Sequence, residues 1–278
     1  MGPTNSYRRT PLSFTLLGIL LALGVFVGFL AGLLGIGGGF TIVPVLMEVF
    51  EREGVLTEHV LPLAIGTSSA TIVFTAIAST RAHHARGAVD WVTVRAMAPG
   101  LVLGSLLGPQ IASALPVRVL AAIFGLFIWS ASYKMVRNKA PKADHELPGG
   151  STLFAVGGGI GVVAGMVGTG GAFLAVPFLT RCNVSMQTAV ATSAAIGIPV
   201  ALAATAGYGY AGWGHAGLPP HSIGYVYVPA LVVIALATTM LAPLGAKMAH
   251  AWPVARLRRA FAAMLFVLGA WMLWKALH

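Results

Sequence analysis

The sequence predicts an all-α polytopic integral membrane protein, made of two homologous halves that are expected to be inverted repeats. Two observations carry this prediction. Of the 278 residues, 57% are hydrophobic and only 9% are charged, and one glycine-rich motif occurs twice. Soluble domains have about 25% charged residues, which keep their surfaces in water. A chain with so few charges and a mean hydropathy of +0.86 is therefore expected to be covered by lipid.

Five apolar segments are expected in the first half, at about residues 12–34, 39–50, 61–80, 92–114 and 117–138, and five counterparts follow from residue 151. Because a span needs about 20 apolar residues, the length allows about eight to ten membrane segments. The second segment is too short for an ordinary span, since about 12 residues rise only about 18 Å. It is expected to be re-entrant, or to be extended by the glycines before it.

The repeat is clearest in the glycine motif, where GFLAGLLGIGGGFTIVPVL from Gly28 matches GVVAGMVGTGGAFLAVPFL from Gly161. The first-copy residues that recur at a constant offset include Gly28, Gly32, Gly35, Gly37, Gly38, Phe40, Val43, Pro44 and Leu46. The repeat predicts a first half over residues 1–140, a polar linker over 141–150 and a second half over 151–278.

Two later matches keep the same order along the chain. LAIGTSSA from Leu63 aligns with TAVATSAA from Thr188, and GPQIASALPV from Gly108 aligns with GAKMAHAWPV from Gly245. With five crossings per half and both termini outside, most Lys and Arg residues fall on one side, whereas four crossings divide them more evenly. Because cytoplasmic loops are enriched in Lys and Arg, the inverted arrangement is favoured.

The glycine stretches are the candidate functional elements. A helix broken inside a membrane leaves backbone groups that only protein or a polar cavity can satisfy. The helix that restarts after the break has a partial positive charge at its N-terminus, which suits an anion. The alternatives are that small residues such as Gly28, Gly32 and Gly35 only let helices pack closely, and that hydroxyls bond back to their own helix.

The predicted substrate-binding residues are the glycines of both breaks and the two Thr-Ser pairs. They are Gly35, Gly37, Gly38, Gly39, Thr67, Ser68, Gly168, Gly170, Gly171, Thr192 and Ser193. Two prolines at equal spacing, Pro44 and Pro177, are expected to break the helix and bound the second segment.

Charge excludes several classes of function. All acidic residues lie in loops or near the ends of expected spans. A membrane cation pathway normally needs buried carboxylates, so an anion or neutral substrate is favoured, and no metal or cofactor is predicted. The net charge of +10 comes from Lys and Arg scattered between apolar runs, which orients a membrane protein and does not indicate nucleic acid.

The paired glycine segments ending in Val-Pro, each followed by a small-residue helix with Thr-Ser, resemble the TauE/SafE family of sulfite and organosulfur exporters. The resemblance covers nearly the whole chain. It implies a multi-pass permease of the bacterial inner membrane that moves small sulfur-containing anions such as sulfite or sulfonates. The second copy has Ala172 where the first has Gly39, which makes it a poorer match to the family motif.

The predicted function is a secondary transporter that exports a small anion by alternating access, with the substrate held between the two halves. The expected partners are that anion and the lipid bilayer, and the sequence is compatible with an oligomer. An anion channel is the alternative of similar kind. An intramembrane enzyme or an accessory subunit of one is the alternative of another class, but the chain contains no HExxH, GxSxG or Walker motif.

Overall fold

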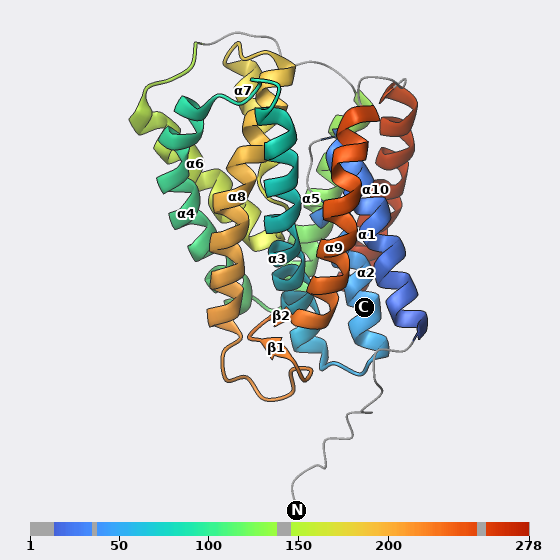
Figure 1. The fold of residues 1–278 in the computed structure, drawn as a ribbon. Helices are drawn as coiled ribbons and strands as arrows, with labels where there is room; N and C mark the ends of the chain where they lie inside the picture. The colour runs from blue at the N-terminus through green and yellow to red at the C-terminus, as the bar shows by residue number, and fades with distance from the viewer. Residues whose placement is uncertain (1–13, 35–37, 138–145, 249–253, 278) are drawn as a thin grey trace, which may run out of the picture.

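A computed structural model describes residues 14–34, 38–137, 146–248 and 254–277, which form ten helices and one short β-hairpin (Figure 1). The first-half helices are α1 (Phe14–Leu34), α2 (Gly39–Arg52), α3 (Thr57–His84), α4 (Trp91–Ala114) and α5 (Val117–Arg137). The second-half helices are α6 (Gly150–Val167), α7 (Ala172–Arg181), α8 (Met186–Ala211), α9 (Val228–Met248) and α10 (Val254–Leu277). Strands β1 (Ser222–Ile223) and β2 (Val226–Tyr227) pair antiparallel between α8 and α9.

The helix bounds lie within a few residues of the expected apolar segments, so the all-α polytopic prediction is confirmed. Among the described residues, six helices are long and apolar enough to cross a membrane: α3, α4, α5, α6, α8 and α9. Helices α1 and α10 contain shorter apolar stretches, and α2 and α7 are the short second helices of the two halves. The chain is therefore a multi-pass membrane protein.

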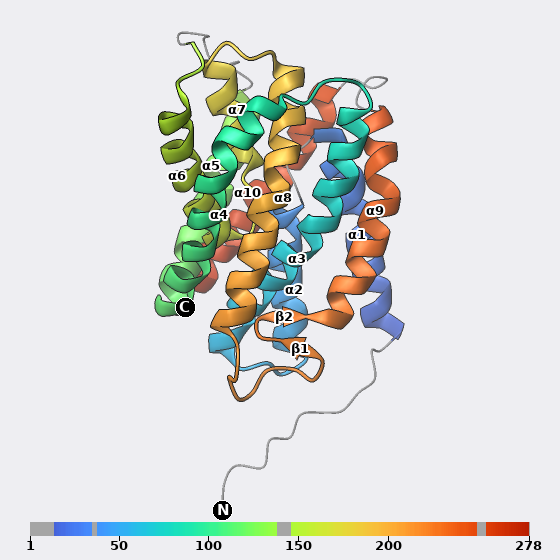
Figure 2. The ribbon, with the colours of Figure 1, turned by 60° about the vertical axis from the view of Figure 1, so that its left-hand side comes forward.

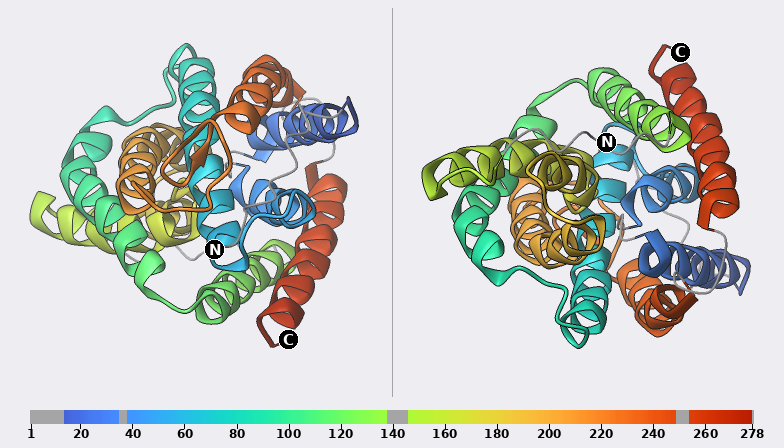
Figure 3. Two further views of the ribbon diagram at one scale, coloured as in Figure 1. Left: turned by 90° about the horizontal axis from the view of Figure 1, so that it is seen from below. Right: turned by 90° about the horizontal axis from the view of Figure 1, so that it is seen from above.

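Helices α3 and α8 occupy the centre of the bundle, as the end views show (Figure 3). In their most apolar stretches 89% and 67% of the residues are buried, against 39–44% for α4, α5, α6 and α9. The outer helices expose large apolar side chains such as Leu126 and Leu236. Such exposure suits contact with lipid chains and would be unfavourable in water.

The outer helices pair across the two halves. Helix α4 packs against α6, α1 against α9, and α5 against α10. Small residues allow these contacts: a Cβ atom on Gly104 would lie 2.2 Å from the Gly158 carbonyl oxygen, and one on Gly28 would lie 2.6 Å from the Thr238 Cα atom. Membrane helices commonly approach through such small residues. The packing interpretation of Gly28 is therefore confirmed.

Corresponding elements of the halves lie toward opposite ends of the bundle. Helix α7 is at the top of Figure 1 and α2 in its lower half, and the β-hairpin before α9 is at the bottom, whereas the connection before α4 is at the top (Figures 1 and 2). This placement agrees with inverted repeats. The inverted relation stays a prediction from the sequence and the charge distribution.

The expectation that the two prolines break a helix is wrong. Pro44 lies inside α2 and Pro177 lies inside α7, and each helix continues beyond its proline. A proline removes one backbone hydrogen bond from a helix interior. Ten residues of α2 are buried, so packing maintains the helix through that loss. Among the described residues, α2 begins after its N-cap Gly38, and the interruption before α7 lies between Gly168 and Gly171.

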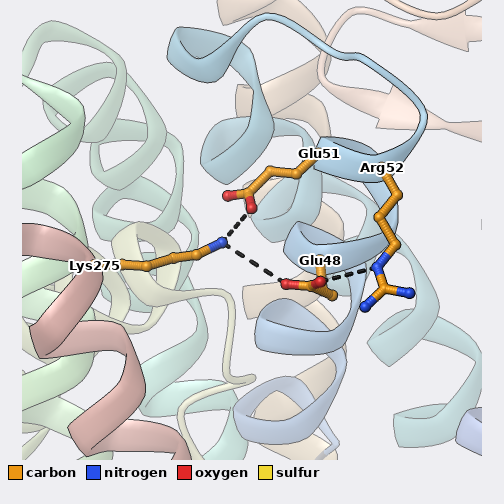
Figure 4. Close-up of polar contacts among 4 residues, drawn as sticks. All are labelled: Glu48, Glu51, Arg52 and Lys275. Atoms are coloured by element: carbon orange, nitrogen blue, oxygen red, sulfur yellow. Dashed lines mark hydrogen bonds and ion pairs between the residues drawn. The ribbon is translucent and has the colours of Figure 1, made fainter. Parts of the chain in front are cut away.

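An ion-pair cluster joins α2 to the end of α10 (Figure 4). Lys275 bonds to Glu51 and lies 3.9 Å from Glu48, which in turn accepts a 2.9 Å bond from Arg52. Exposed pairs of this kind contribute about 0–1 kcal/mol. The cluster brings acidic residues of α2 and the last turn of α10 to the same end of the bundle.

The β-hairpin covers that same end of the bundle. The Tyr225 hydroxyl lies 3.2 Å from Nδ1 of His59 in the first turn of α3. Burial, with a smaller contribution from the carboxylate of Glu58, raises the pKa of Tyr225 above its ordinary value. The phenol therefore stays protonated at neutral pH and can donate a hydrogen bond to His59.

Candidate functional site

The start of α2 packs against the glycine break between α6 and α7. A Cβ atom on Gly39, the first residue of α2, would lie 2.1 Å from the carbonyl oxygen of Gly168. Gly38 is the N-cap of α2, and its carbonyl oxygen accepts bonds from the N–H groups of Thr41 and Ile42. The predicted site residues Gly35 and Gly37 lie outside the described residues. The structure thus brings Gly38 and Gly39 of one half against the break of the other.

The second break needs glycine for its backbone conformation. Gly168, Gly170 and Gly171 have φ angles of +66°, +72° and +78°. Only glycine adopts this region readily. Gly168 ends α6 and Gly171 is the N-cap of α7, so the chain reverses direction between them. The first N–H groups of α7 have no partner within the helix, and they lie at this reversal.

A small cavity lies beside the second break, between the two halves. Its volume is about 20 Å³, which is room for about one water molecule. Its polar lining comes from Thr75, Ser79, Thr169 and Ser193, together with the backbone of Gly170. The remaining lining residues are Ala31, Ile72, Ala76, Ala172, Ala194 and Gly197. Helices α1 and α3 of the first half and α7 and α8 of the second therefore line one cavity.

Three hydroxyls of this cavity lack a hydrogen-bond partner within the described part of the chain: those of Ser79, Thr169 and Ser193. Their residues are only 6%, 1% and 0% exposed. Leaving a buried hydroxyl unpaired costs about 1–3 kcal/mol, so such groups are uncommon unless a ligand or water satisfies them. Their convergence on one cavity indicates a binding site for a ligand with hydrogen-bond acceptors.

The lining side chains carry no charge, and none of the described lining residues is a carboxylate. Among the described residues no cluster of three His, Cys, Asp or Glu side chains could hold a metal ion. The cavity offers hydroxyl groups and the N-terminal end of α7. Both are suited to a small anion or a neutral polar molecule.

Of the four predicted hydroxyl residues, only Ser193 lines the cavity. Ser68 donates to the Gly168 carbonyl oxygen at 3.4 Å and so supports the second break. Thr67 accepts a bond of 2.9 Å from the backbone N–H of Tyr227, and Thr192 accepts one of 3.1 Å from the backbone N–H of Asp90. Of the predicted glycines, Gly170 lines the cavity, and Gly168 and Gly171 shape the reversal beside it.

The Thr67 and Thr192 contacts form a reciprocal pattern. Tyr227 directly precedes α9 and Asp90 directly precedes α4, and these are the fourth helices of their halves. The third helix of each half therefore holds the start of the fourth helix of the other half. The two contacts belong to connections at opposite ends of the bundle (Figure 2).

The first residues of the short helices also meet. The ring centroids of Phe40 in α2 and Phe173 in α7 lie 5.5 Å apart, edge to face, and Phe127 of α5 completes the cluster. The Lys134 ammonium lies 5.0 Å from the Phe173 ring centroid. Phe40 and Phe173 are matching positions of the glycine motif, so both copies of the motif converge beside the cavity.

The chain resembles known proteins along nearly its whole length. The family model "Sulfite exporter TauE/SafE" matches residues 20–272. A probable membrane transporter protein of Haemophilus influenzae is 35% identical over 257 residues, which are 91% of this chain and 97% of that relative. A probable membrane transporter protein of Methanocaldococcus jannaschii is 27% identical over 271 residues, 93% of this chain and 96% of its own. No solved structure matches the chain.

The apolar helices, the matching family model and the relatives together define the class of protein: a multi-pass membrane transporter and not an enzyme. Within that class, the chain belongs to the TauE/SafE sulfite exporter family.

Proposed function

We propose that this protein is a secondary transporter that exports a small sulfur-containing anion, sulfite or a small sulfonate, across the inner membrane of a bacterium. The observation that carries the proposal is the group of three buried, unpaired hydroxyls around one cavity at the N-terminus of α7. The family name supplies the sulfur anion as the first substrate to test.

The chemistry of the cavity supports an anion. Hydroxyl donors and a helix N-terminus stabilise negative charge, and the described lining has no carboxylate that would favour a cation. The candidate substrate-binding residues are therefore Ser79, Thr169 and Ser193 for their hydroxyls, with Gly170 and Ala172 at the end of α7. Gly39, Gly168 and Gly171 shape the backbone around them.

The size of the cavity supports alternating access. A volume of about 20 Å³ holds about one water molecule, so binding of an anion with several heavy atoms would enlarge the site. The reciprocal Thr67 and Thr192 contacts each join one half to the other. Rocking of the halves would release one contact at a time and open one end of the bundle. Export of an anion would follow the electrical gradient.

The test is flux of radiolabelled sulfite in liposomes that contain the purified protein. The proposal predicts saturable uptake, which unlabelled sulfite on the opposite side stimulates, because a loaded carrier returns through the same conformations. Empty liposomes are the control. Uptake that does not saturate and shows no such exchange would favour the anion channel, and absence of flux for sulfite and sulfonates would contradict the proposal.

A further inference from the structure

We propose that the cavity selects an oxyanion that carries one negative charge and one acidic hydrogen, such as hydrogensulfite, over the fully deprotonated dianion. The inference rests on the proposed function and specifies the substrate of that same cavity. Two features carry it: a hydroxyl whose proton is already engaged within the protein, and a described lining that contains no cationic side chain.

The accepting hydroxyl belongs to Thr75. A hydroxyl has a single proton to donate. Thr238 directs its proton to the Ala235 carbonyl oxygen at 3.1 Å, and Thr75 donates to the Thr238 hydroxyl at 3.1 Å. The other acceptor within reach of Thr75, the Thr71 carbonyl oxygen at 3.3 Å, would also use the Thr75 proton. With its proton engaged by either acceptor, the Thr75 hydroxyl has only lone pairs left for a ligand in the cavity that this residue lines.

The other three hydroxyls complement this acceptor. Those of Ser79, Thr169 and Ser193 have no partner within the described residues, so their protons are free to point at a ligand. A ligand that matches the whole lining accepts at several oxygens and donates one hydrogen, to Thr75. A hydrogen-bearing oxyanion has this pattern. A dianion has no hydrogen to donate, and it would face the Thr75 lone pair with an unfavourable contact.

The charge of the site also favours a monoanion over a dianion. The described lining residues carry no positive side chain, and a helix N-terminus contributes about half a positive charge. One negative charge can be stabilised by that partial charge and by hydroxyl donors. A second charge would be buried without a counter-charge in a low-dielectric region, which is costly.

The wild-type protein allows a test that needs no substitution. Initial rates of sulfite exchange are measured in liposomes with equal pH on both sides, over a series of pH values around the pKa of hydrogensulfite. Above that pKa the hydrogensulfite fraction falls about tenfold per pH unit, and the rate at a fixed subsaturating total sulfite concentration is expected to fall with it. Methanesulfonate, a monoanion without an acidic hydrogen, is the control, and its exchange is expected to be independent of pH.

A pair of variants assigns the effect to Thr75. Thr75→Val is expected to lower hydrogensulfite exchange about tenfold by removing the acceptor. Methanesulfonate has no acidic hydrogen to donate to Thr75, so its exchange is expected not to fall. Thr71→Val is the matched control, because the Thr71 hydroxyl bonds to the Thr67 carbonyl oxygen and is not part of the cavity lining. It is expected to keep the wild-type pH profile.

The outcomes separate this inference from the proposed function. Sulfite exchange that rises with pH, or does not change with it, would overturn the selection of a hydrogen-bearing monoanion and leave the transporter intact. Equal losses of sulfite and methanesulfonate exchange in Thr75→Val would overturn the role of Thr75. Absence of exchange for every oxyanion in the wild-type protein would instead overturn the proposed function.

Discussion

Replacing Gly39 with alanine is expected to destabilise the protein by about 1–3 kcal/mol, the usual cost of overpacking, and to abolish most of its transport. The added Cβ atom would lie 2.1 Å from the Gly168 carbonyl oxygen and 3.0 Å from the Thr169 Cα atom. Both neighbours are backbone, so the two breaks would have to move apart. Thr169 would then shift relative to the other hydroxyls of the cavity.

Gly159→Ala is the matched control for this substitution. Gly159 lies within α6 and a Cβ atom there would meet nothing within 4 Å. Alanine favours a helix over glycine by about 0.5–1 kcal/mol, so this variant is expected to melt at or above the wild-type temperature in detergent. A Gly39→Ala protein with wild-type melting temperature and flux would contradict the close contact between the two breaks.

Removing the cavity hydroxyls is expected to weaken substrate binding without weakening the fold. A hydrogen bond to a charged group contributes about 1.5–3 kcal/mol, so Ser193→Ala and Thr169→Val are each expected to raise the KM for the anion at least about tenfold. Because neither hydroxyl has a partner within the described residues, the melting temperatures without substrate are expected to stay at or above the wild-type value.

The buried hydroxyl of Ser132, outside the cavity, is the matched control for these two substitutions. Ser132 of α5 donates to the Ala262 carbonyl oxygen of α10 at 2.8 Å and is not part of the cavity lining. Ser132→Ala is expected to lower the melting temperature, since it removes this hydrogen bond between α5 and α10, and to keep the KM. The proposed location of the site would be contradicted if Ser132→Ala raised the KM without lowering the melting temperature while Ser193→Ala left the KM unchanged.

Much of the fold was predictable because hydropathy and the glycine repeat are strong local signals. The apolar segments gave the helices, and the match between Gly28 and Gly161 located both breaks. The behaviour of Pro44 and Pro177 was not predictable from these signals. Proline disfavours a helix interior by itself, but α2 is largely buried, and tertiary packing is not visible in local sequence.

The cavity was only partly predictable, because the comparison of the two halves selects residues that recur in both. Thr169 occupies the position where the first motif has Ile36, and Ser79 aligns with Ala204. The residues that line the cavity therefore include positions at which the halves differ. Conversely, Thr67 and Thr192 do recur, and they bond to the connections before α9 and α4. Recurrence in both halves therefore marks residues that hold the halves together as well as residues of a binding site.

The location of the bound anion tests whether the cavity beside the second glycine break is the substrate site. Selenite, in which selenium replaces the sulfur of sulfite, can be found by anomalous diffraction from crystals of the purified protein grown with it. A selenium peak is expected within hydrogen-bonding reach of the Thr169 and Ser193 side chains, with the cavity enlarged around it. A peak only at the surface of the bundle, with the cavity unchanged, would show that the substrate binds elsewhere.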